Sequence, residues 1–143
     1  MTRRKVIDLL NTALELEHSA RIQYLSHAET LFGLDSEPII VRLKEIAGDE
    51  LKHEEMFREQ IGALGGVPSM KLAPTLQADG IKKVLEVNLK GETDAIDFYR
   101  KILEEIRNSK DELKYEDLRL EHQVRHVIMD EMEHAQELKL LLG

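Results

Sequence analysis

The chain has 143 residues, of which 42% are hydrophobic and 34% charged, a composition that excludes a disordered chain. It has no cysteine, which excludes disulfides, thiolate metal sites and cysteine nucleophiles. A formal charge of -8 at pH 7 argues against nucleic acid or an anionic membrane as partner and would attract cations. Since no apolar run is long enough for a transmembrane helix or a signal peptide, we expect one cytoplasmic domain spanning residues 1–143.

Apolar residues recur every three to four positions along most of the chain, which is the helical period. The pattern breaks at Gly33, at residues 65–74 with their two glycines and two prolines, and at residues 108–111. Ser109 in the last break and Glu112 just after it have the spacing of a capping box. No segment alternates with the two-residue period of a strand. The pattern therefore predicts an all-α chain with helices over residues 3–32, 37–64, 79–108 and 111–142.

The predicted helices have the length of helices in a four-helix bundle. Two of their connections are short and predict antiparallel hairpins, the first helix with the second and the third with the fourth. The connection over residues 65–78 is longer than a hairpin needs, and when extended it would reach about 46 Å. We therefore favour a crossover along the whole bundle, with the third helix starting at the same end as the second, over a loose surface loop.

A carboxylate interrupts the apolar stripe of every predicted helix, and in two helices a histidine follows it by three residues. These side chains are Glu17, Glu50 with His53, Glu92, and Glu131 with His134. An isolated buried carboxylate costs several kcal/mol, so four of them require compensation. Two divalent cations would balance the four negative charges. The pattern thus favours two metal ions in the core over a metal-free bundle of ion-paired helices.

The two acids of each predicted hairpin are equidistant from its turn. The midpoint between Glu17 and Glu50 lies beside Gly33, and the midpoint between Glu92 and Glu131 lies in the second turn. In an antiparallel hairpin, residues equidistant from the turn lie at the same height. The spacing therefore predicts that the carboxylates of each pair lie level with one another.

The chain also repeats itself. The pattern Glu-x-x-Ala-x-x-x-Tyr occurs at residues 17–24 and 92–99, and Asp-Glu-x-x-His occurs at residues 49–53 and 130–134. Because positions i and i+3 share a helix face, each Glu-x-x-His can hold one ion. The alanine one turn after each lone glutamate would leave room for ions and a small oxidant.

These motifs resemble the inward-facing Glu and Glu-x-x-His pattern of the ferritin-like superfamily. The segments Leu10–Asn11, Gln23–Tyr24 and Asp49–His53 are similar to bacterioferritin, and the resemblance runs from about residue 6 to residue 142. It implies a ferritin-like four-helix bundle with a long crossover between helices two and three. It also implies two iron ions, with Mn or Zn as substitutes, and a ferroxidase that oxidises Fe(II) with O2 or H2O2 in iron storage, detoxification and oxidative-stress protection.

The same resemblance implies how the residues would act. Six side chains would be both metal ligands and catalytic residues: Glu17 and Glu92 as terminal ligands, Glu50 and Glu131 as bridging ligands, and His53 and His134 through one nitrogen each. Two aspartates would each orient the histidine of the opposite motif, namely Asp49 and Asp130. Tyr24 and Tyr99 are expected as core aromatics, and a second role as hydrogen-bond donors to a ligand carboxylate or as electron donors stays open.

Two of the departures from bacterioferritin concern its haem and its cage. Leu51 stands where bacterioferritin has its haem-ligating Met, and since leucine has no donor atom we expect no haem bound in that way. The sequence ends soon after His134, so the short fifth helix of bacterioferritin is not expected and its cage is in doubt. We expect a homo-oligomer, at least a dimer, whose size up to a cage the sequence leaves open.

Two other functions stay open at this point. A rubrerythrin-like peroxide-reducing enzyme uses a similar bundle, but it would have a further glutamate at the position of Ala95 and usually a cysteine-rich domain. The other is a metal-binding assembly protein without turnover.

Overall fold

The computed structural model describes residues 2–143 and contains four helices, α1 (Thr2–Ala28), α2 (Ser36–Ala63), α3 (Gly80–Asn108) and α4 (Asp117–Leu142). Over these residues there is no strand, so the all-α prediction is confirmed. Across the same part of the chain, none of the helices has the length and apolar character needed to span a membrane.

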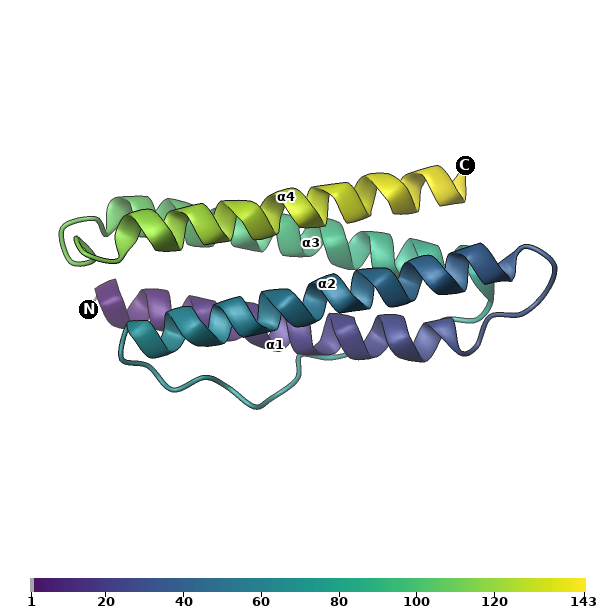
Figure 1. Cartoon of the computed structure of the whole chain (residues 1–143), viewed down its shortest axis with the longest axis horizontal. Coiled ribbons are helices and arrows are strands. Elements are labelled where there is room, and N and C mark those ends of the chain that lie inside the picture. The colour runs from purple at the N-terminus through teal and green to yellow at the C-terminus, as the bar shows by residue number, and fades with distance from the viewer. Residues whose placement is uncertain (1) are drawn as a thin grey trace.

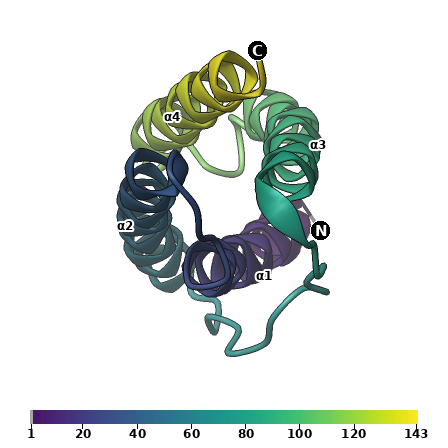
Figure 2. The same ribbon diagram turned by 90° about the vertical axis from the view of Figure 1, so that its right-hand side faces the viewer.

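The helices form a bundle with the ring order α1, α2, α4, α3 (Figure 2). In Figure 1, α1 and α4 run from left to right, whereas α2 and α3 run from right to left. The segment between α2 and α3, residues 64–79, passes along the outside of the bundle beside α1 (Figures 1 and 2). The predicted crossover is therefore present, and α3 begins at the end of the bundle where α2 begins.

The crossover segment, residues 64–79, is attached to α1. The Nδ1 atom of His18 lies 2.7 Å from the carbonyl oxygen of Lys71, and the Nε2 atom of His27 lies 2.9 Å from that of Leu76. Both histidines are buried. Because buried donors anchor it, the crossover segment lies on the bundle as a fixed element and not as a loose loop.

The end of α2 shows how the chain enters this segment. Gly65 has a φ of +85°, and the amide of Gly66 donates to the carbonyl of Ile61 at 2.9 Å while that of Gly65 donates to Gly62 at 3.0 Å. These bonds form a Schellman motif, which needs a left-handed residue that glycine adopts without strain. A Cβ on Gly66 would lie 2.6 Å from Cγ2 of Ile7, so this position also needs a residue without a side chain.

Two helix boundaries differ from the prediction. The first helix ends at Ala28 and not at residue 32, and the fourth begins at Asp117 and not at residue 111. The hydroxyl of Ser109 donates to the carbonyl of Glu105 at 2.6 Å, so Ser109 closes α3 and does not open α4. Turns follow, and they bury Leu113 completely.

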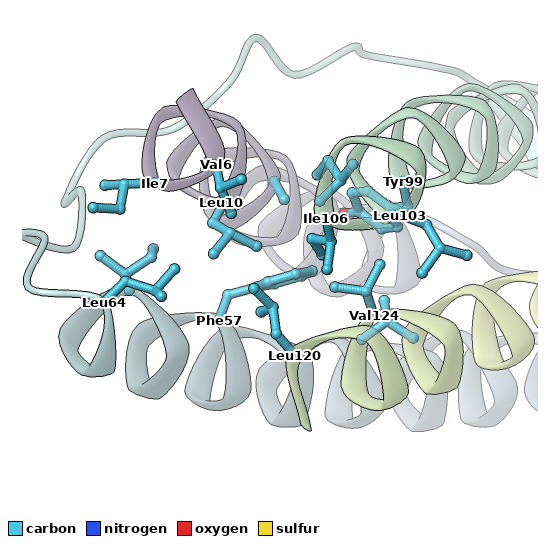
Figure 3. Packing of buried hydrophobic residues seen from close by; sticks show 14 of the residues in the cluster. Val6, Ile7, Leu10, Phe57, Leu64, Tyr99, Leu103, Ile106, Leu120 and Val124 are labelled. Carbon is cyan, nitrogen blue, oxygen red and sulfur yellow. The ribbon is translucent and has the colours of Figure 1, made fainter. Parts of the chain in front are cut away.

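The hydrophobic core consists of two clusters at different heights in the bundle. One gathers side chains from all four helices near the N-terminus, among them Leu10, Phe57, Ile106 and Leu120 (Figure 3). The other gathers side chains nearer the opposite end, among them Leu43, Ile46, Leu85 and Leu138. Along each helix the interrupting carboxylate falls between residues of the two clusters. The apolar clusters therefore exclude water above and below one polar layer.

Candidate metal centre

Every helix contributes one carboxylate to this polar layer. The four glutamates and two histidines singled out from the sequence are buried, with none more than 3% exposed. Their ligand atoms form two groups in which all atoms lie within 4.8 Å of one another: Glu17, Glu50, His53 and Glu131, and Glu50, Glu92, Glu131 and His134. Since Glu50 and Glu131 belong to both groups, the arrangement offers two adjacent sites that share two carboxylates.

The two histidines direct the same ring nitrogen at these sites. His53 Nδ1 lies 3.5 Å from Glu17 Oε2 and 3.2 Å from Glu131 Oε1. His134 Nδ1 lies 3.4 Å from Glu50 Oε1 and 3.6 Å from Glu92 Oε1. The centroids of the two imidazole rings are 6.4 Å apart. Each ring therefore faces its own group of carboxylates.

One atom of each of the six side chains is buried without a hydrogen-bond partner. These atoms are Oε2 of Glu17, Oε1 of Glu50, Nδ1 of His53, Oε2 of Glu92, Oε1 of Glu131 and Nδ1 of His134. Leaving a buried polar group unpaired costs about 1–3 kcal/mol, and native proteins rarely leave it so. Over residues 2–143 only one further side-chain atom, Oε1 of Gln123, shares this state. Carboxylate oxygen and imidazole nitrogen are donors that iron, manganese and zinc accept, so these residues fit a pair of divalent cations.

Each histidine holds its other ring nitrogen against an aspartate of the opposite motif. His53 Nε2 lies 2.8 Å from Oδ2 of Asp130, and His134 Nε2 lies 2.9 Å from Oδ2 of Asp49. A carboxylate only accepts, so Nε2 carries a proton and Nδ1 is the nitrogen that faces the centre. The structure thus brings together both predicted pairs, and each pair links α2 to α4.

Each buried tyrosine hydroxyl donates a hydrogen bond to a glutamate on another helix of the bundle. Tyr24 donates to Oε1 of Glu92 at 2.6 Å, and Tyr99 donates to Oε1 of Glu17 at 2.7 Å. Burial raises the pKa of both phenols well above 10.0, and the neighbouring carboxylates add to this. Both phenols therefore stay protonated as donors, and each uses the glutamate oxygen that is not the unpartnered one.

The carboxylates titrate unequally in the absence of cations. Burial and then repulsion from Glu131 raise the pKa of Glu50 well above 4.5. Burial and repulsion from Glu92 likewise raise the pKa of Glu131. Burial, the largest effect, acts to raise the pKa of Glu92, but His134, Glu131 and the hydroxyl of Tyr24 together outweigh it and the pKa is lowered. Four negative charges are therefore not tolerated together, as expected of carboxylates that share one apolar site.

The histidines take up the missing positive charge. Burial acts to lower the pKa of His53, but the carboxylates of Glu131 and Glu17 that face its Nδ1 raise it to about 11. The pKa of His134 is also raised, since the carboxylates of Glu92 and Asp49 together outweigh its burial. Without metal, the protonated imidazoles supply the positive charge that metal cations would otherwise supply. Metal binding must therefore release protons.

Comparison with known proteins identifies the family. The ferritin-like domain matches this sequence over residues 7–142. The chain belongs to the ferritin-like family. The bacterioferritin of Desulfovibrio desulfuricans is 31% identical over 108 residues, which are 75% of this chain and 60% of that protein. The bacterioferritin of Brucella melitensis is 33% identical over 97 residues, 67% of this chain and 60% of that protein. This ferritin-like chain thus matches less than two thirds of the length of these bacterioferritins.

Solved ferritin-like structures agree with the observed fold. A ferritin-like, di-iron-carboxylate protein of Bacillus anthracis matches with a TM-score of 0.93 and 28% identity, over 100% of this chain and 99% of that one. The bacterioferritin of Rhodobacter capsulatus, solved with a metal-free dinuclear site and a haem iron, matches with a TM-score of 0.82 and 28% identity, over 97% of this chain and 84% of that one. The predicted ferritin-like bundle and the resemblance to bacterioferritin are confirmed.

One buried acid beside the centre was not singled out from the sequence. Glu54, next to His53, is 1% exposed, and its carboxylate accepts a hydrogen bond from Arg58 at 3.2 Å and is also paired with Arg21. The Nε2 atom of His18 lies 3.6 Å from Oε1 of Glu54. Because these partners balance its charge, Glu54 is not an uncompensated buried carboxylate like those of the centre. The arginine one turn after it in the sequence is the signal that could have identified this ion pair.

Proposed function

We propose that this protein binds two iron ions at the centre and oxidises Fe(II) with O2 or H2O2 as electron acceptor. The observation that carries the proposal is that six side chains from four helices each present one buried, unpartnered donor atom to the same small volume. Family membership and the likeness to a di-iron-carboxylate protein support iron as the metal.

The position of each residue would decide whether it bridges the two ions or binds one of them. Glu50 and Glu131 belong to both groups and would bridge the ions, whereas Glu17 and Glu92 would each bind one. Bound as a pair, two Fe(II) ions supply the two electrons that O2 takes up on reduction to H2O2, or H2O2 on reduction to water. Asp130 and Asp49 hold a proton on Nε2 of each imidazole, so that Nδ1 would bind a metal ion after releasing its own proton. The two apolar clusters keep bulk water out.

Haem is not required by this proposal. Leu51 on α2 is 44% exposed and has no donor atom, so a haem iron cannot be ligated through that side chain. The spectrum of protein purified from haem-supplied cells, which should lack a Soret band, tests this expectation.

Three wider expectations remain proposals. We propose that residues 1–143 form one domain, that the protein acts in the cytoplasm, and that it self-associates at least as a dimer. Sedimentation of the purified chain measures its mass in solution, and a monomer at micromolar concentration would contradict self-association.

Stepwise loading tests the ferroxidase proposal. Metal-free protein should bind about two Fe(II) per chain without oxygen, and an oxidant should then produce ferric absorbance rapidly. Glu50→Gln keeps the side-chain volume but removes a shared carboxylate, so it should abolish paired oxidation. Glu55→Gln, an exposed change on the same helix, serves as the matched control. Unchanged turnover in Glu50→Gln would show that the bridging assignment is wrong.

The peroxide-reducing alternative predicts a different result in the same experiment. Ala95 occupies the position where that class has a further glutamate, and here it is a partly exposed residue of α3. We therefore expect oxidation of Fe(II) to proceed without an external electron donor. A strict need for such a donor would favour the rubrerythrin-like reading, and inert bound metal would favour an assembly protein.

A further inference from the structure

A cavity of about 260 Å³ connects the protein surface with the metal centre between α1 and α3. Its inner end is lined by Glu50, Glu92 and Glu131, which belong to the centre, and its outer end by Pro74 and Leu76 of the crossover segment. The cavity is therefore a passage with the proposed metal ligands at one end and solvent at the other.

Small side chains form the middle of this passage. Ala20 on α1 faces the cavity together with Gly91 and Ala95 on α3. A Cβ on Gly91 would meet no atom within 4 Å, so this glycine borders open space. Larger residues at the two alanines would place carbon atoms in the passage, because both alanines line it directly.

The mouth of the passage is fixed. Gln23 Oε1 accepts a hydrogen bond from the amide of Leu76 at 2.7 Å, and Gln23 Nε2 donates to Oδ1 of Asn88 at 3.0 Å. These bonds join the crossover segment, α1 and α3 at one point. The opening therefore does not depend on a moving lid.

Between the mouth and the carboxylates of the centre, the polar side chains that line the passage already have partners. Besides Gln23 and Asn88, the Ser19 hydroxyl donates to the carbonyl of Leu16 at 3.0 Å. At the mouth, Lys90 lies 3.2 Å from Asp94, so the pair brings no net charge to the entrance. No free carboxylate lies along the passage before its inner end, so nothing there would compensate a divalent cation for the loss of its hydration shell. A small neutral molecule has little desolvation cost when it enters the same passage.

We propose that dioxygen reaches the metal centre through this passage, between Ala20 of α1 and Ala95 of α3. The inference deepens the proposed function and rests on it, because it names the oxidant and its route. The apolar lining selects a neutral apolar molecule, and the tyrosines and carboxylates at the inner end lie where it would arrive.

Relaxation of methyl signals by dissolved O2 tests the route without turnover. In zinc-loaded protein, whose metal is redox-inactive, the methyl groups of Ala20 and Ala95 should relax faster under O2 than that of Ala78. Ala78 is also partly exposed but does not line the passage, so it serves as the matched control. Equal enhancement at all three methyl groups would overturn the proposal, since O2 would then show no preference for the passage.

Blocking the passage gives the second readout. Ala95→Leu should lower the second-order rate constant for O2 roughly tenfold, equivalent to about 1.4 kcal/mol in the barrier, while anaerobic Fe(II) binding stays at the wild-type stoichiometry. Ala20→Leu narrows the passage from the opposite helix and replaces the first variant should that one fail to fold. Ala63→Leu, an exposed change at the end of α2, is the matched control.

The outcomes separate the two proposals. Wild-type protein that binds Fe(II) but does not oxidise it would contradict the proposed function. Fast oxidation by wild type and by both passage variants would overturn the route alone. A lower rate that comes with lost Fe(II) binding would also overturn the route, because the substitution would then act on the centre itself.

Discussion

Tyr99 in α3 donates a hydrogen bond of 2.7 Å to Glu17 in α1. The second copy of the repeat shows the same relationship, with Tyr24 in α1 bonded to Glu92 in α3 at 2.6 Å. Each tyrosine therefore donates a hydrogen bond to the glutamate of the other repeat. These two hydrogen bonds hold one oxygen of each glutamate in place and leave its other oxygen free to bind a metal ion.

Replacing this tyrosine should destabilise the metal-free protein. Tyr99→Phe removes the donor and leaves Oε1 of Glu17 buried and unpaired, so the free energy of unfolding should fall by about 1–3 kcal/mol. Urea denaturation in the presence of a chelator measures the change. Tyr115→Phe, whose side chain is 87% exposed in the turn before α4, is the control. Equal stability of the two variants would contradict the importance of this hydrogen bond.

The aspartates that touch the histidines should control metal affinity. Asp130→Asn keeps an oxygen near Nε2 of His53 but removes the negative charge that favours the proton on Nε2. The affinity for Co(II) should fall about 10–100-fold, the usual effect of losing such a partner. Competition with a chromophoric chelator gives the constant. Asp97→Asn, exposed on α3, should bind Co(II) like wild type, and an unchanged affinity in Asp130→Asn would argue against an orienting role.

The metal-free protein should lose stability as the pH rises above neutrality. His53 has a folded-state pKa of about 11 against an ordinary value of 6.5, so above pH 6.5 the unfolded chain releases this proton while the folded chain keeps it. The stabilisation is therefore complete below the ordinary pKa and is lost as the pH rises towards the folded one. His134, Glu50 and Glu131, whose pKa values are also raised, act in the same direction.

Only Glu92 among these residues acts in the opposite direction. Its lowered pKa adds stability that is complete above about pH 4.5 and therefore constant over the neutral range. Denaturation of metal-free protein from about pH 6 to pH 9 should thus show a steady fall in the free energy of unfolding. Zinc-loaded protein should not show it, because metal binding displaces the protons. A flat profile without metal would refute the proton-sharing described above.

Much of the centre could be predicted from spacing alone. Residues equidistant from a turn lie level in an antiparallel hairpin, and this rule places Glu17 beside Glu50 before any coordinates are known. The pairing of His53 with Asp130 was implied by the family resemblance and not by spacing. What the sequence could not show is the passage, because it depends on where the crossover segment lies against α1 and α3.

The helix boundaries show a second limit. Ser109 and Glu112 have the spacing of a capping box, and a local rule therefore starts the last helix near residue 111. In the structure, Ser109 hydrogen-bonds back to α3 and the turns after it bury Leu113, so tertiary packing decides the boundary. The contacts of His18 and His27 with the crossover segment were hidden for the same reason.

The Schellman motif at the end of α2 allows a test with two glycines of opposite expected effect. Gly65 has a φ of +85°, where a Cβ costs roughly 1–2 kcal/mol, so Gly65→Ala should lower the free energy of unfolding by about that amount. Gly62 lies inside the helix with no atom within 4 Å of an added Cβ, and Gly62→Ala should raise stability by up to about 1 kcal/mol through helix propensity.

Thermal and urea denaturation of zinc-loaded protein would measure both variants under one condition. Because the two substitutions are chemically identical and only three residues apart, any difference in sign reports the backbone conformation and not the added methyl group. If Gly65→Ala were as stable as Gly62→Ala, the chain would not leave α2 through a left-handed residue. The start of the crossover segment would then follow a different path.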